Sequence, residues 1–286
     1  NSFLHFFPKI GIILNIDADH LDFFKDLDDI RNSFRRFAEL LPEDGTLIIN
    51  TCIPDLSKIT EGLACKVITY GDDGDYSAAD ISHNERGEAS FDLLRHGTLT
   101  DRIELSVNGD HNVSNALAAI AAADLLNVPS GAVKDGLRSF GGTDRRFELK
   151  GTVNGVTVID DYAHHPTEIR ASLAAAKNYP HREIWCIFQP HTYTRTKALF
   201  QDFVDVLCTA GHVIMADIYA ARETDTLGIS SADIAAALKE NGCDAYYFSS
   251  FREIEDFCVR TCQTGDLLIT MGAGDVVNIG EELLKR

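Results

Sequence analysis

The stretch IDDYAHHPTEI, residues 159–169, gathers several chemically active residue types at the end of an apolar run. They are Asp160, Asp161, Tyr162 and the adjacent histidines His164 and His165. Carboxylates, a phenol and an imidazole at one turn can bind a polar substrate and move protons. A structural explanation stands beside this one: the two aspartates can cap the following helix, with the proline in its first turn, where the missing N–H costs nothing. The stretch alone leaves both interpretations open.

A second acidic cluster, DADH, directly follows the apolar run KIGIILNI near the start of the sequence. Asp17, Asp19 and His20 offer two carboxylates and an imidazole to a divalent cation. Magnesium prefers oxygen ligands, so a histidine would be an unusual member of its shell. A helix cap or a core contact explains the same residues without any metal.

Two pairs of residues fit a nucleotide. Asn112 and Asn115 are three apart on a predicted helix, so their amides share a face, and an amide matches the donor and acceptor edge of adenine. Capping by Asn112 is the alternative. Arg145 and Arg146 follow a GGTD turn, where a guanidinium can neutralise charge on a transferring phosphoryl group, although solvated arginines explain them equally. The GxG of TMGAGDV lacks a third glycine, and tight packing suffices to explain it.

The composition limits the class of protein. With 286 residues, 45% hydrophobic and 24% charged, the chain matches a soluble globular protein with room for two domains. Its net charge of −18 repels nucleic acid and anionic membranes, so neither is expected as a partner. No apolar run reaches the ~20 residues that span a bilayer, and no signal peptide is recognisable. The seven scattered cysteines include no CxxC pair, which predicts reduced core thiols in a cytoplasmic protein.

The first half of the chain is predicted to hold a buried parallel strand, two helices and a small antiparallel insertion. KIGIILNI is a short β-branched run that ends in a loop, which is typical of a buried parallel strand. Apolar residues recur at helical spacing within residues 26–45 and again within residues 111–126. Short runs between Lys66 and Val107, separated by Gly, Asp and Asn, predict the antiparallel insertion.

From about Phe147 onward, strand and helix patterns alternate. The strand-like runs are GVTVID, EIWCIF, HVIMAD, AYYF and DLLITM. Helical patterns occupy residues 167–178, 197–209, 231–241, 250–262 and 276–285. This alternation predicts a Rossmann-like, doubly wound, mostly parallel sheet with helices on both faces. Ligands bind beyond the carboxyl ends of such strands. The polar clusters DADH, DDYAHH, QPHTYTRT, DIYAARE and GAGD all follow predicted strands.

Taken in order, seven motifs resemble the Mur ligases of bacterial cell-wall synthesis, and the resemblance covers essentially the whole chain. They are NIDADHLDFF, GDHNVSNALAA, FGGTDRRFE, IDDYAHHPTEI, FQPHTYTRTKAL, DIYAARE and TMGAGDV. The doubled histidine and QPHTYTRT are most similar to the members that join L-alanine to UDP-N-acetylmuramic acid, and the murein peptide ligases of cell-wall recycling are the nearest alternative. The resemblance implies that residues 1–146 are the carboxy-terminal part of the central ATP-binding domain, with its small antiparallel insertion. Residues 147–286 then form the Rossmann-like carboxy-terminal domain.

The resemblance implies an ATP- and Mg²⁺-dependent ligase. In this family the lactyl carboxylate of UDP-N-acetylmuramic acid is phosphorylated, and the amine of L-alanine attacks the acyl phosphate. Residue by residue, His111, Asn112 and Asn115 match the adenine-binding positions. Asp161 matches the aspartate that holds the ribose, and His20 matches a magnesium ligand.

The resemblance also implies roles at the reacting groups. Arg145 and Arg146 match the pair that faces the γ-phosphate and the acyl phosphate. His164 matches a residue beside the reacting carboxylate and completes the catalytic candidates. The candidate substrate contacts are Tyr162, His191 and Arg195. Phosphoryl transfer needs positioning and charge stabilisation more than a nucleophilic side chain, so this set is chemically coherent.

The sequence departs from the family pattern in two ways. No GxxxxGK[ST] motif occurs, and the P-loop and UDP-binding domain of the family would lie before Asn1, so we expect a carboxy-terminal fragment that is inactive by itself. Thr192 replaces an arginine of some members, which weakens the case for a substrate contact there. A non-catalytic nucleotide-binding or interaction module is the alternative from another class. An oxidoreductase is disfavoured, because no glycine fingerprint opens the second domain. The oligomeric state is left open.

Overall fold

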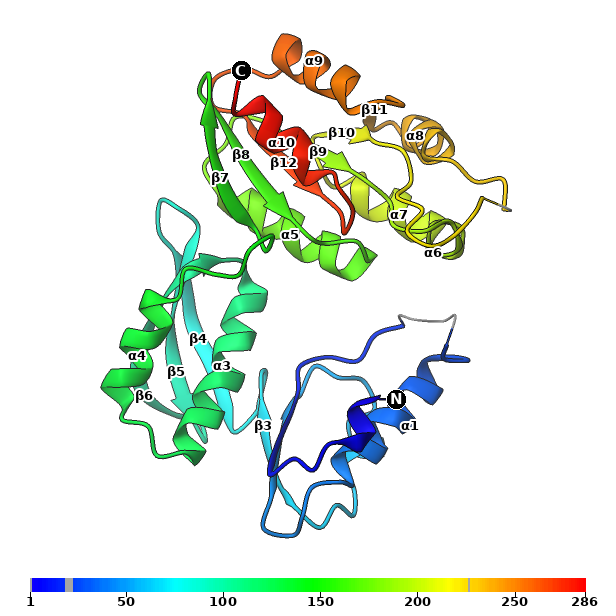
Figure 1. Ribbon diagram of the computed structural model, residues 1–286. Coiled ribbons are helices and arrows are strands. Elements are labelled where there is room, and N and C mark those ends of the chain that lie inside the picture. Colours follow the sequence, from blue (N-terminus) through cyan, green and yellow to red (C-terminus); the bar gives the residue numbers. More distant parts are fainter. Residues whose placement is uncertain (1, 19–22, 226) are drawn as a thin grey trace. The chain divides into compact units, whose positions relative to one another are not determined.

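The computed structural model describes residues 2–18, 23–225 and 227–286. The chain divides into two compact α/β units, each built on a six-stranded sheet (Figure 1). The first unit comprises Asn1–Asn84 and Glu88–Gly141, and the second comprises Gly142–Arg286 with Glu85–Gly87. The predicted α/β class is therefore confirmed. The domain boundary between residues 146 and 147 stays a prediction, since the compact units divide after Gly141.

The sheet of the first unit combines parallel and antiparallel strands in the order β1-β2-β3-β4-β5-β6. The strands are β1 (Ile10–Ile13), β2 (Thr46–Asn50), β3 (Lys66–Tyr70), β4 (Tyr76–His83), β5 (Glu88–Arg95) and β6 (Thr98–Asn108). Strands β4, β5 and β6 are antiparallel, as expected for this region. The expectation was wrong for β3, which pairs in parallel with β2 along its whole length. A short apolar run does not reveal the direction of its partner strand.

Helices cover both faces of this sheet because the side chains of β2 alternate between them. Ile48 packs in one cluster with Ile120 of α3, whereas Leu47 and Ile49 pack in another with Ile30 of α1. The helices are η1 (Ser2–His5), α1 (Leu27–Ala38), α2 (Ser57–Thr60), α3 (Asp110–Leu125) and α4 (Ser130–Ser139). Both helices predicted for this half are confirmed as α1 and α3.

The sheet of the second unit has the order β11-β10-β9-β12-β8-β7. Its strands are β7 (Glu148–Val153), β8 (Val156–Asp161), β9 (Ile184–Phe188), β10 (His212–Met215), β11 (Asp244–Tyr247) and β12 (Leu267–Met271). All neighbours run parallel except β7, an edge strand that is antiparallel to β8. All five predicted strands are present, and the mostly parallel sheet is confirmed.

Helices lie on both faces of the second sheet, which makes it doubly wound (Figure 1). On one face α5 (Pro166–Asn178), α7 (Phe200–Leu207) and α8 (Ser231–Glu240) share a core cluster with the strands. The opposite face is covered by α9 (Phe251–Thr261) and α10 (Val277–Leu283). The helix predicted at 197–209 is two helices, α6 (Tyr193–Ala198) and α7. In the part of the chain that the structure describes, no helix has both the length and the apolar surface to cross a membrane.

The cysteines differ from the prediction that all seven are reduced core thiols. Cys208 and Cys243 form a disulfide, with Cα atoms 5.6 Å apart. They follow α7 and α8, elements that lie side by side although 35 residues separate the two cysteines in sequence. Cys65, Cys186 and Cys258 are buried free thiols, as expected, whereas Cys52 is exposed. The spacing of cysteines in the sequence could not show that two neighbouring elements bring a pair together.

Candidate active site

The polar loops of the second unit begin at one edge of its sheet. In the register of the strands, Asp161 at the end of β8 lies opposite Met271 of β12, and Met271 lies opposite Phe188 of β9. Met215 of β10 lies opposite the same Phe188. Four strands therefore end level with one another. The predicted clusters DDYAHH, GAGD, QPHTYTRT and DIYAARE leave the sheet side by side.

A row of aromatic rings crosses this edge. The Tyr162 and His164 ring centroids are 5.5 Å apart, and His164 and His191 are 5.8 Å apart. His191 stacks on Tyr219 with centroids 5.7 Å apart. Arg195 joins the row through its Nη1, 3.5 Å from Nδ1 of His191. The structure thus brings together the candidate residues Tyr162, His164, His191 and Arg195.

Tyr219 belongs to this row, although it is not among the site residues predicted from the sequence. Its cluster, DIYAARE, was recognised as following a strand, but no residue in it was given a role. The backbone holds Tyr219 against the β9 loop, because its N–H donates to the carbonyl of Pro190 and its own carbonyl accepts from Thr192. The side chain is 38% exposed, so its ring forms an accessible wall beside His191.

The two adjacent arginines have different surroundings. The Arg146 side chain is 53% exposed, and its Nη1 lies 3.7 Å from Glu168. Its guanidinium also lies over the Tyr162 ring, 5.5 Å from the centroid. A long, partly exposed ion pair of this kind is weak, so the guanidinium can turn toward a negatively charged ligand. The location of Arg146 is compatible with the role inferred for it.

Arg145 is instead held inside the unit. Its Nε donates to Asp160 at 2.8 Å, and the Asp160 side chain is 0% exposed. Its Nη1 and Nη2 donate to the carbonyls of Gly274 and Gly272. A Cβ on either glycine would collide with Gln189, which explains the glycines of TMGAGDV by tight packing. The guanidinium fastens the end of β8 to the loop after β12, and its contact with a phosphate stays a prediction.

Asp161 also has an internal role. One carboxylate oxygen accepts from the backbone N–H of Ala163 at 2.8 Å. The other accepts from Ser172 Oγ at 2.8 Å and from the backbone of Phe147 at 3.1 Å. Burial raises the pKa of Asp161 above its usual value, although these hydrogen bonds and the charge of Arg146 oppose the rise. The carboxylate shapes the turn after β8, and its contact with a ribose stays a prediction.

The cap of α5 is formed by neither aspartate. His165 accepts from the backbone N–H of Thr167, and the Glu168 side chain accepts from the backbone of His165, which together make a capping box. Pro166 occupies the first turn, as the structural alternative required. Asp160 and Asp161 are therefore available to hold the site together. Glu168 serves two purposes, because it also pairs with Arg146.

Burial lowers the pKa of His191 below its usual value of 6.5, and charges on His164 and Arg195 lower it further. The carboxylate of Glu223, which accepts a hydrogen bond from the backbone of Thr194 at 3.0 Å, acts in the opposite direction. We expect the His191 imidazole to titrate below pH 6.5 in an NMR titration of its ring signals. Since the folded state then binds fewer protons than the unfolded state, this group contributes stability above pH 6.5 that is lost as the pH falls through the folded pKa.

A charge-removal pair tests the cause of this shift. Glu223→Gln should lower the midpoint of His191 further, because it removes a charge that raises the pKa. Glu240→Gln is a matched control, since it lies at the end of α8, directly before β11 and therefore at the opposite edge of the sheet. A midpoint at or above 6.5, or an equal response to both substitutions, would show that this assignment of charges is wrong.

The candidate nucleotide residues of the first unit lie at the start of α3. Asn112 donates from its amide to the carbonyl of Asn108 at 2.8 Å, and Asn115 donates to the amide oxygen of Asn112 at 3.1 Å. The two amides therefore share a face, as their spacing predicted, and Asn115 is exposed. His111 lies on the same turn. Asn112 does not occupy the N-cap position, which is taken by Gly109.

The candidate metal ligand His20 lies outside the described residues, as does Asp19. The neighbouring Asp17 accepts a hydrogen bond from the backbone of Ala18. Across the described ranges, no group of three or more His, Cys, Asp and Glu side chains is arranged to hold a metal ion. Magnesium binding through His20 therefore stays a prediction.

Two family models match the two halves of this chain. A model of the Mur ligase middle domain matches residues 2–123, and a model of the Mur ligase, glutamate ligase domain matches residues 145–274. The chain belongs to the Mur ligase family, as its motifs predicted. Individual relatives are more specific than these two family models. The chain is 56% identical over 288 residues to the UDP-N-acetylmuramate–L-alanine ligase of Lachnospira eligens, a match that covers 100% of this chain and 63% of that protein.

Further relatives agree with this match. The ligase of the same name from Lachnoclostridium phytofermentans is 53% identical, over 100% of this chain and 64% of its own length. The solved UDP-N-acetylmuramate–alanine ligase of Thermotoga maritima is 28% identical with a TM-score of 0.80, over 99% of this chain and 60% of that one. A murein peptide ligase from Psychrobacter arcticus is 26% identical with a TM-score of 0.67, over 100% and 58%. The chain spans less than two thirds of the length of each of these relatives.

Proposed function

We propose that this protein acts as an ATP-dependent ligase that joins L-alanine to UDP-N-acetylmuramic acid through an acyl phosphate. The reaction would take place in the cytoplasm and supply a peptidoglycan precursor. The observation that carries the proposal is the 56% identity, over the whole chain, to a relative named for this reaction. The row of Tyr162, His164, His191 and Arg195 at the sheet edge supports it, because the row offers cationic and hydrogen-bonding groups to a carboxylate and an amine.

Each group at the edge has a role that follows from its surroundings. Arg146 stabilises the negative charge that develops on the transferring phosphoryl group, for which its half-exposed guanidinium is suited. Arg195 pairs with the carboxylate of the incoming amino acid, and His191 lies beside it to fix its orientation. Arg145 and Asp160 hold the turn that carries Arg146 and Tyr162 in position. The work of these residues is positioning and charge stabilisation.

Some of the candidate nucleotide-binding residues are suited to bind ATP. The exposed amide of Asn115, fixed by its bond to Asn112, can pair with the edge of an adenine. Asp161 fits the ribose less well, because both of its oxygens already accept hydrogen bonds from the protein. ATP would supply the phosphoryl group and Mg²⁺ would neutralise its charge, with His20 as the candidate ligand.

An isotope experiment tests the proposal. The full-length enzyme is given ATP, Mg²⁺, L-alanine and UDP-N-acetylmuramic acid labelled with ¹⁸O in the lactyl carboxylate. An acyl phosphate intermediate transfers one ¹⁸O from the carboxylate to the released phosphate, which mass spectrometry detects. Phosphate release without label excludes this route. Nucleotide binding without any product supports the non-catalytic module instead.

A murein peptide ligase is the second candidate, because the solved member of that group matches the whole chain at 26% identity. The two functions differ in the amine that attacks. The same assay with a murein tripeptide in place of L-alanine distinguishes them through the ratio of the two kcat/KM values. We expect L-alanine to be preferred, and a preference for the tripeptide would reverse the assignment.

A further inference from the structure

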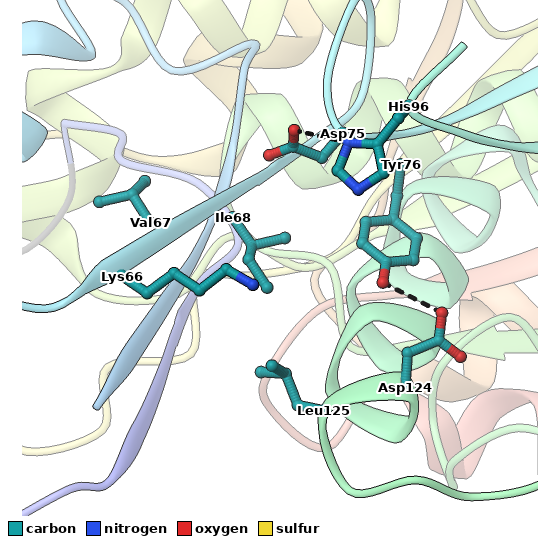
Figure 2. Close-up of a pocket in the computed structure, with 8 residues that line it drawn as sticks. All are labelled: Lys66, Val67, Ile68, Asp75, Tyr76, His96, Asp124 and Leu125. Carbon is teal, nitrogen blue, oxygen red and sulfur yellow. Dashed lines mark hydrogen bonds and ion pairs between the residues drawn. The ribbon is translucent and has the colours of Figure 1, made fainter. Parts of the chain in front are cut away.

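The first unit contains a pocket that none of the proposed roles uses. Its volume is about 250 Å³, and it lies between β3, the start of β4, the turn after β5 and the last turn of α3 (Figure 2). The lining residues are Lys66, Val67, Ile68, Asp75, Tyr76, His96, Asp124 and Leu125. Asn112 lies at the other end of α3, about 18 Å away along a helix that rises ~1.5 Å per residue. The pocket is therefore separate from the candidate adenine residues.

The two carboxylates of the pocket already accept hydrogen bonds from protein groups. Asp124 accepts from Arg95 at 2.7 Å and 3.2 Å, and from the hydroxyl of Tyr76 at 3.0 Å. Asp75 accepts from the backbone and hydroxyl of Thr69, and its other oxygen lies 3.2 Å from His96. Figure 2 shows the contacts of Asp124 with Tyr76 and of Asp75 with His96 as dashed lines. The charge of Asp124 is therefore paired with Arg95, whereas Asp75 is hydrogen-bonded by neutral groups of Thr69 and has a cationic partner only when His96 is protonated.

The ammonium group of Lys66 is different. Lys66 is the first residue of β3 and its side chain is exposed, extending along the pocket (Figure 2). In the described part of the chain, no carboxylate pairs with its Nζ, and the two acids of the pocket, Asp75 and Asp124, have other partners. Burial and the hydrogen bond to Asp124 raise the pKa of Tyr76 to about 12, so its phenol remains neutral. Lys66 is therefore a cation at the pocket that has no carboxylate partner of its own among the described residues.

The other walls are apolar. Val67, Ile68 and Leu125 line the pocket, and Ile68 belongs to the buried core between the sheet and α3. The aromatic ring of Tyr76 is also buried and adds a flat surface. A pocket with a cation at one end and an apolar body matches a molecule with the complementary pattern. At about 250 Å³ it is smaller than the roughly 300–1,000 Å³ of most ligand sites, which restricts it to small molecules.

We propose that this pocket binds a small organic carboxylate, whose negative group pairs with Lys66 and whose apolar body lies against Val67, Ile68, Leu125 and the ring of Tyr76. The inference does not rest on the proposed ligase activity, because the pocket shares no residue with the candidate active site. Lys66 repels an amine at this end of the pocket and Asp124 is already paired with Arg95, while phosphate is disfavoured because it has no apolar part.

The test is an NMR titration of the ¹⁵N-labelled chain with sodium benzoate. We expect saturable shifts centred on the amides of Lys66, Tyr76, His96 and Leu125. Lys66→Met keeps most of the side-chain stem, removes the charge, and should weaken binding by about tenfold, the effect of one charge-assisted hydrogen bond. Lys66→Arg should restore most of the affinity. Lys239→Met, on α8 of the second unit, is the matched control and should have no effect.

Three further ligands identify which part of the molecule is recognised. Acetate carries the charge alone, benzamide carries the ring alone, and inorganic phosphate carries charge without an apolar body. Each should bind more weakly than benzoate. The proposal is wrong if benzoate produces no saturable shifts at these residues, if Lys66→Met binds as tightly as the parent, or if phosphate binds as well as benzoate.

Discussion

Replacing Arg146 by alanine in the full-length enzyme should lower kcat by about 10²-fold or more while changing the KM for ATP little. The reason is that a donor placed where charge develops acts mainly in the transition state. The guanidinium is suited to this task, because its side chain is 53% exposed and its ion pair with Glu168 is 3.7 Å long. Steady-state kinetics at saturating L-alanine and UDP-N-acetylmuramic acid measure both parameters.

Two variants complete this experiment. Arg146→Lys keeps the charge but loses the planar fork that bridges two oxygens, so it should rescue kcat poorly. Arg170→Ala is the matched control, since Arg170 is an exposed arginine on α5, the helix that also carries Glu168. Each protein is checked by its thermal melt. If Arg146→Ala retained a near-parental kcat, the phosphoryl role of Arg146 would be refuted and the solvated arginine would be the better explanation.

The neighbouring substitution should act on stability instead. Arg145→Met removes the partner of Asp160, whose side chain is 0% exposed. Within the described residues, the buried carboxylate then keeps one hydrogen-bond donor, the hydroxyl of Thr270. Breaking a buried ion pair in this way costs about 3–5 kcal/mol, and we expect the lower end because Arg145 is partly exposed. Urea denaturation measures the loss in the free energy of unfolding.

A double-mutant cycle separates the pair from its surroundings. Asp160→Asn removes the charge that Arg145→Met would leave unpaired, so the double variant should be less destabilised than the sum of the single variants. Arg146→Met is the matched control, since the same chemical change at the exposed arginine should cost less than about 1 kcal/mol. A loss below about 1 kcal/mol for Arg145→Met would contradict the inference that Arg145 holds β8 to the loop after β12.

The contrast between these two arginines follows from the backbone. Arg145 has a φ of 59° and Phe147 a φ of 50°, both in the left-handed region that non-glycine residues seldom adopt. Hydrogen bonds hold this turn in place, because the carbonyl of Arg145 accepts from Tyr162 and the N–H of Phe147 donates to Asp161. The guanidinium of Arg145 is therefore directed to Asp160, while that of Arg146 remains at the surface beside Glu168.

Much of the second unit could be predicted from local patterns in the sequence. Its buried parallel strands are continuous apolar runs, which predicted the strands β8 to β12. These runs alternate with segments of helical periodicity, which predicted the doubly wound class. The location of the candidate site followed as well, because polar clusters after parallel strands must share one edge. The antiparallel edge strand β7 was missed. Only part of its surface is buried, and it lacks an apolar run.

The sequence by itself determined the family, the strand and helix alternation, and the set of candidate residues, because these are properties of short segments and of their order. Only the tertiary structure decided how those residues are used. Arg145 bonds Gly272 and Gly274, Tyr219 stacks on His191, and Cys208 meets Cys243. Each of these contacts joins residues that lie far apart in the chain and are brought together by the packing of the sheet and its loops. No local pattern contains that information, since the partner of a side chain is chosen by the fold.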